Sequence, residues 1–154
     1  MRSALFVIVV FGSVLLCARE TRGQCTCAPQ YVNITARAEF NLAYAVFVGK
    51  VVTIKNSPRD QNDHYVETVT FEVTRAWKHD LNSNLTLTNT IGGCLNGYKE
   101  NEEWLVYVYK HRDGTLGSAC CCTRTTLLTR ASDDLKTFAA DPAAKILRPQ
   151  TSEP

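Results

Sequence analysis

Hydrophobic and polar residues alternate over two long stretches of the chain, a period of two that is typical of half-buried β-strands. In residues 65–77 the positions predicted to face inward are hydrophobic: Tyr65, Val69, Phe71, Val73 and, at the end of the run, Trp77. In residues 84–90, Leu85 and Leu87 are predicted to face inward, with threonines between them facing outward. Each stretch therefore predicts one strand.

Three further stretches predict strands through their composition. Residues 45–54 are rich in β-branched and aromatic residues and end at a turn sequence over residues 56–58. Residues 104–109 form a similar run, and residues 116–123 follow the tight-turn signal Asp113-Gly114. Because Gly49 interrupts the first of these runs, we expect a bulge or sharp bend there.

Helical signals are short. Ser132 opens an amphipathic stretch over residues 132–138 with acidic residues in its first turn, which predicts an N-capped helix. Residues 34–44 are ambiguous between a short helix and the lead-in to a strand, because the apolar pattern covers so few positions. Five strands with a small helix predict a mainly β fold, a closed or nearly closed five-stranded barrel.

The N-terminus is typical of a secretory signal. An apolar run over residues 4–18 follows Arg2 and is shorter than the ~20 residues that a bilayer-spanning helix needs. Residues 1–24 are therefore predicted to be removed, by cleavage after Gly23 or Gln24, and the protein to be secreted to the extracellular space. Residues 25–140 are expected to form one domain, and residues 141–154 a flexible tail.

Net charge argues against two classes of partner. The chain has 154 residues and a formal charge of +2, but its basic excess lies in residues 1–24. The rest carries equal numbers of acidic and basic side chains, which gives no support for binding to nucleic acid or to an anionic membrane. Membrane insertion is not expected either, because the apolar run belongs to the predicted signal.

Six cysteines lie beyond the predicted signal: Cys25, Cys27, Cys94, Cys120, Cys121 and Cys122. An even number in an exported chain indicates disulfide bonds. A thiolate metal site is the alternative, but zinc ligands usually come in pairs two to four residues apart. Export also makes Asn33 and Asn84 predicted glycosylation sites, because each begins an Asn-x-Thr acceptor.

Common catalytic motifs are missing from the sequence, which has no His-Glu-x-x-His, Gly-x-Ser-x-Gly or phosphate-binding glycine loop. Three isolated histidines in polar surroundings are expected to be solvated: His64, His79 and His111. The acidic group Glu100, Glu102 and Glu103 is expected to be a solvated loop, with a carboxylate pair for acid–base chemistry as the alternative. The chain is therefore predicted not to be an enzyme.

Several motifs, in order, resemble a netrin-like domain. They are Cys25-Thr26-Cys27-Ala28-Pro29, Ala45-x-Phe47-x-Gly49-Lys50-Val51, Gly93-Cys94-Leu95-x-Gly97 before Trp104-Leu105-Val106, and Asp134-Leu135. Within that group the Cys-x-Cys-x-Pro head resembles the tissue inhibitors of metalloproteinases, and the likeness spans residues 25–138. The resemblance implies a disulfide-stapled, five-stranded OB-fold-like barrel and tight inhibition of secreted zinc metalloendopeptidases.

The same resemblance implies that the N-terminal cysteine acts on the target enzyme. Cys25 would bind the target's catalytic zinc through its α-amino nitrogen and carbonyl oxygen, so the inhibitor needs no cofactor of its own. Thr26 would enter the enzyme's main specificity pocket. The remaining contact residues that the resemblance implies are Cys27, Ala28, Pro29, Ile91, Gly92 and Gly93.

The cysteine pairing implied by the resemblance joins Cys25 to Cys94, and Cys27 to one of Cys120, Cys121 and Cys122. Two alternatives depend on this chain itself. Cleavage after Gly23 would leave Gln24 ahead of the cysteine, and the amide formed there is a poor zinc ligand. The other alternative is a non-inhibitory extracellular module of the same fold that binds matrix or another secreted protein.

Overall fold

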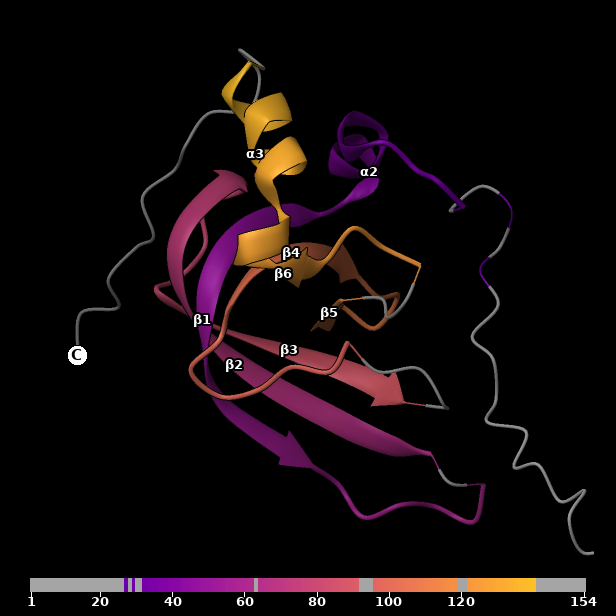
Figure 1. Cartoon of the computed structure of the whole chain (residues 1–154). Helices are drawn as coiled ribbons and strands as arrows, with labels where there is room; N and C mark the ends of the chain where they lie inside the picture. Colours follow the sequence, from indigo (N-terminus) through magenta and orange to yellow (C-terminus); the bar gives the residue numbers. More distant parts are fainter. Residues whose placement is uncertain are drawn as a thin grey trace, which may run out of the picture.

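The computed structural model describes Cys27, Pro29 and residues 32–62, 64–91, 96–118 and 122–140. Five antiparallel strands form one nearly closed barrel in the order β3-β2-β1-β4-β5, which confirms the predicted fold class (Figure 1). They are β1 (Ala45–Asn56), β2 (Tyr65–Lys78), β3 (Asn84–Ile91), β4 (Glu103–Lys110) and β5 (Leu116–Gly117). A further two-residue strand, β6 (Thr126–Leu127), pairs with β4.

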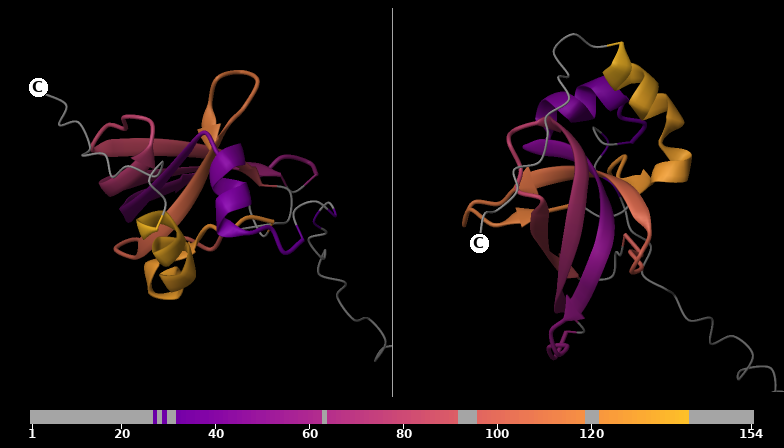
Figure 2. Two further views of the ribbon diagram at one scale, coloured as in Figure 1. Left: turned by 90° about the horizontal axis from the view of Figure 1, so that it is seen from above. Right: turned by 90° about the vertical axis from the view of Figure 1, so that its left-hand side faces the viewer.

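Two short helices, α2 (Ala36–Leu42) and α3 (Ser132–Ala139), lie at the same end of the barrel, and a 3-10 turn, η2 (Leu128–Arg130), leads into α3 (Figure 2). The ambiguous stretch before β1 is thus helical, and Thr35 caps it by accepting a hydrogen bond from the Ala38 amide. The predicted second helix is present, but Ser132 is not its cap. Ala131 occupies that position and provides no side-chain hydrogen bond.

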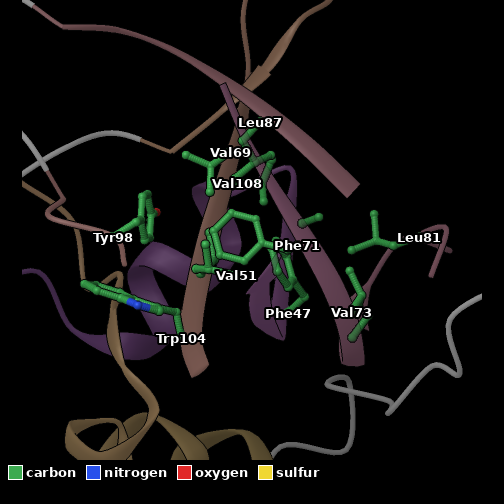
Figure 3. Close-up of a cluster of buried hydrophobic side chains, with 13 residues drawn as sticks. Phe47, Val51, Val69, Phe71, Val73, Leu81, Leu87, Tyr98, Trp104 and Val108 are labelled. Atoms are coloured by element: carbon green, nitrogen blue, oxygen red, sulfur yellow. The ribbon is translucent and has the colours of Figure 1, made fainter. Parts of the chain in front are cut away.

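Hydrophobic residues form two cores, one on each face of the sheet. The barrel interior contains the T-shaped contacts of Phe71 with Phe47 and Tyr98, whose ring centroids are each 5.3 Å away (Figure 3). The second core lies between the outer face of β1 and β4 and the two helices, where Phe40 packs on Phe138. The first half of β1 is therefore buried on both faces, which explains its nearly continuous hydrophobic run.

Irregular pairing of β1 with β2 changes the face on which side chains lie. Register shifts occur between Val46 and Phe47 and between Val48 and Gly49, which confirms the expected bulge near the glycine. Beyond these shifts Ala76 lies in the barrel core, and Trp77 packs in the helix-covered core on the other face. The expectation that Trp77 joins Val73 inside the barrel is therefore wrong, because alternation does not continue through a bulge.

The fifth strand is shorter than the predicted residues 116–123. It ends at Gly117, because the next amide, that of Ser118, donates to the Asn89 side chain instead of to a neighbouring strand. Farther along, the Arg124 amide donates to the Glu39 carboxylate. Side-chain acceptors thus replace the strand ladder on both sides of residues 119–121, which lie outside the described residues.

We predict that Gly49→Ala destabilises the barrel by about 1–3 kcal/mol. A Cβ there would lie 2.9 Å from the Phe47 ring and 3.0 Å from the Glu72 carbonyl oxygen. Urea denaturation measures the change, with Lys55→Ala, an exposed site on the same strand, as the matched control. Equal stability of the two variants would contradict the close approach of β1 and β2.

Candidate functional site

The predicted contact surface is described in part. Cys27, Pro29 and Ile91 lie within the described residues. Outside them lie the other contact residues and the remaining cysteines: Cys25, Thr26, Ala28, Gly92, Gly93, Cys94, Cys120 and Cys121. The structure therefore shows how the head is attached to the barrel.

A disulfide bond joins Cys27 to Cys122, with 5.4 Å between their Cα atoms and a sequence separation of 95. Of the three adjacent cysteines, Cys122 is thus the one bonded to the head. A cross-link over so many residues restricts the unfolded chain strongly in the chain-entropy model. It also fixes the head beside the segment that leads to α3.

A backbone hydrogen bond links Pro29 at the end of the head to the residues that lead into α2. The Val32 amide donates to the Pro29 carbonyl oxygen at 3.2 Å, and Pro29 is exposed. The Val32 side chain is 55% exposed, an apolar surface residue close in sequence to the head that sequence analysis did not single out. Ile91 differs, because only 5% of it is exposed at the end of β3.

Arg124 lies at the centre of a buried polar network two residues after Cys122. Its guanidinium forms a bidentate ion pair with Asp134, with Nε 2.7 Å from Oδ1 and Nη2 2.6 Å from Oδ2. A third nitrogen, Nη1, donates to the Ile34 carbonyl oxygen at 3.2 Å. The segment after Cys122 is thereby bonded to α3 and to the chain entering α2.

Glu39 completes the network from α2. One carboxylate oxygen accepts from the Arg124 amide and the other from the Tyr109 hydroxyl, each at 2.8 Å. The Tyr107 hydroxyl donates to Asp134 at 2.6 Å, so β4 joins as well. Glu39 and Asp134 are 0% and 3% exposed, and both carboxylates find donors, as buried charges require.

Burial and hydrogen bonding shift the pKa values of this network. Burial raises the pKa of Glu39, although the hydrogen bonds from Tyr109 and Arg124 lower it in part. Burial, with the Asp134 carboxylate beside it, also raises the pKa of Tyr107. The Asp134 carboxylate raises the pKa of Arg124, so the guanidinium keeps its charge. The network thus joins two helices and β4 to the segment that carries Cys122.

Sequence analysis did not identify this network. Glu39 lies on the same face of α2 as the apolar residues Ala36 and Phe40. A carboxylate at such a position could have indicated a buried polar contact. Asp134 was predicted only as a first-turn acidic residue. Arg124 gave no signal, because two of its three partners, Glu39 and Ile34, lie 85 and 90 residues away in sequence.

The three histidines have separate surroundings. His64 contacts the Asp60 carboxylate at 3.6 Å, His79 stacks on Tyr44 with centroids 4.3 Å apart, and His111 is exposed. In the predicted acidic loop, Glu102 accepts a hydrogen bond from the Trp104 indole at 3.2 Å. Across the described ranges, no three His, Cys, Asp or Glu side chains are grouped as a metal site requires.

The predicted glycosylation sites are both exposed. Asn33 lies in the turn after the head with φ of 62°, and Asn84 begins β3.

No helix in the described part of the chain has the length and hydropathy needed to span a membrane. Comparison with models of known protein families gives no match, and a search of curated proteins gives none either.

We predict that the double variant Cys27→Ser/Cys122→Ser loses about 4 kcal/mol of stability, because it removes a cross-link over 95 residues. Urea denaturation under non-reducing conditions measures the loss, and peptide mapping checks that the remaining cysteines keep their pairing. A loss below 1 kcal/mol would contradict the view that this bond constrains the unfolded chain.

We predict that Asp134→Asn destabilises the protein by about 3 kcal/mol, because Arg124 would then lack its charged partner. The matched control is Asp133→Asn, since Asp133 is 84% exposed at its side chain and 3.7 Å from Lys136. Its expected effect is within about 0.5 kcal/mol. Equal effects in thermal or urea unfolding would show that the ion pair of Asp134 with Arg124 contributes no more to stability than the exposed pair of Asp133 with Lys136.

Proposed function

We propose that this protein is a secreted inhibitor of zinc metalloendopeptidases that presents Cys25 to the catalytic zinc of its target. The observation that carries the proposal is the disulfide between Cys27 and Cys122. It holds the residue two positions after Cys25 on a segment that Arg124 fixes to the protein core. The motif resemblance and the nearly closed barrel support the same function.

The proposed chemistry needs a neutral amine. An α-amino group ordinarily has a pKa of about 7.7–8.0, so it loses its proton at small cost near neutral pH and can then donate its lone pair to zinc. The Cys25 carbonyl oxygen is the second proposed ligand, and together they would displace the water that the enzyme uses for hydrolysis. The metal belongs to the target, and the inhibitor supplies two ligands.

Rigidity distinguishes an inhibitor from a substrate in this proposal. A flexible peptide loses conformational freedom when it binds, whereas a head ordered during folding loses less. The bond at Cys27 and the network around Arg124 provide that order on one side of the head. The proposed bond between Cys25 and Cys94 would provide it on the other side.

The proposed contact surface follows from the same arrangement. Thr26 would enter the specificity pocket, and Pro29 with exposed Val32 would extend the apolar edge of the head. Gly92 and Gly93 would contribute backbone contacts, since they directly follow Ile91, which is buried at the end of β3. The partners are secreted zinc metalloendopeptidases, with extracellular matrix as a further partner outside the cleft.

We predict that a protein starting at Cys25 inhibits a zinc metalloendopeptidase and that the same protein with Gln24 in front does not. The extension converts the amine into an amide, so the inhibition constant should rise by at least about 100-fold, the effect of losing one strong metal ligand. Inhibition assays on the two refolded proteins measure this, with circular dichroism and melting temperature as the control for folding.

Equal inhibition by both forms would refute zinc binding by the amine. If neither form inhibits while both fold, the non-inhibitory binding module becomes the better account. Sequencing of the secreted protein's N-terminus then shows which form is made naturally.

A further inference from the structure

Four polar side chains inside the barrel hold the seam where β3 meets β5. This seam cluster consists of Glu67, Asn89, Tyr98 and Ser118, which are 5%, 6%, 6% and 5% exposed. The Ser118 amide donates to Asn89 Oδ1, and the Tyr98 and Ser118 hydroxyls share a hydrogen bond, each at 2.8 Å. These bonds connect β3 to the end of β5 and to the loop before β4.

Glu67 is the member of the cluster whose carboxyl group has too few hydrogen-bond donors around it. It lies on β2 directly opposite Asn89 of β3. Within the described residues, Glu67 Oε1 and Asn89 Nδ2 are buried side-chain atoms without a hydrogen-bond partner. The contrast with Glu39 is sharp, because both oxygens of that buried carboxylate accept hydrogen bonds.

Few charged groups face Glu67. From the loop before β4 comes Tyr98, a neutral phenol whose pKa burial raises. The partner of Glu67 on β1 is the uncharged Asn56, and the residue before Asn56 is the exposed Lys55. From the hairpin after β4, His111 approaches Gly117, and this histidine is exposed. Burial raises the pKa of Glu67, and the Asn89 side chain lies close enough to oppose that rise in part, although its amide nitrogen does not reach hydrogen-bond geometry.

The seam is closely packed beside Asn89. A Cβ on Gly117 would lie 2.8 Å from the Thr88 carbonyl oxygen and 3.1 Å from Asn89 Oδ1. The backbone of β5 therefore packs directly on β3. Ionised Glu67 would be a buried anion with an unpaired oxygen, a state that burial disfavours unless water reaches it.

We propose that Glu67 is a proton-operated latch of the barrel seam, which closes β3 on β5 while the side chain is a neutral acid and loosens when the side chain ionises. A carboxyl whose pKa is raised in the folded state binds more protons there than in the open state. Closure is therefore fully stabilised at low pH and weakens as the pH rises through the folded-state pKa. The proposal does not depend on protease inhibition.

Hydrogen exchange of the Ser118 amide tests the latch, because that amide donates to Asn89 across the seam. The full secreted chain and its Glu67→Gln variant are measured between pH 5 and pH 8, after correction for intrinsic exchange. Glu72→Gln is the matched control, since Glu72 is exposed on the same strand. Protection of the parent protein should fall by up to about tenfold per pH unit between the ordinary glutamate pKa of 4.5 and the raised pKa of Glu67 in the closed state, and level off above that pKa.

The variants separate the possible outcomes. Glu67→Gln should keep Ser118 protection constant with pH, and Glu72→Gln should behave like the parent. A parent profile without pH dependence, or a Glu67→Gln profile that follows the parent, would overturn the latch. If Glu67→Gln fails to fold, a carbon-13 NMR titration of the parent's Glu67 carboxyl decides, because a midpoint at the ordinary value of 4.5 would also overturn it.

Discussion

The buried ion pair between Arg124 and Asp134 is the interaction on which the arrangement of this molecule depends. Arginine suits the position because its planar guanidinium binds both carboxylate oxygens and still has a donor for the Ile34 carbonyl. The loss of hydration is offset by the hydroxyl of Tyr107 and by the partial exposure of Arg124. One side chain thus joins the two helices to the segment that carries the head.

Two polar clusters inside one small fold have opposite properties. In the Arg124 network both carboxylates are hydrogen-bonded, so the network makes the local structure rigid. In the seam cluster a carboxyl oxygen and an amide nitrogen are buried without partners among the described residues. The first cluster lies beside the proposed binding edge, and the second lies where β3 meets β5.

Sequence patterns predicted the strands well because alternation reports directly which face is buried. They failed where a side chain replaced a backbone partner, as Asn89 does at Ser118, because such bonds join residues far apart in sequence. They also failed beyond a bulge, where Trp77 changed faces. At the site, motif likeness implied a bond from Cys27 to one of three cysteines, but spacing could not choose among them or reveal Arg124.

The proposed function requires Cys27 to be ordered before any partner binds. Nitrogen-15 relaxation of the Cys27 amide in the free secreted protein measures this most directly. The account predicts an order parameter of about 0.85, equal to that of the barrel strands. A value below about 0.6, with rigid strands in the same protein, would contradict it.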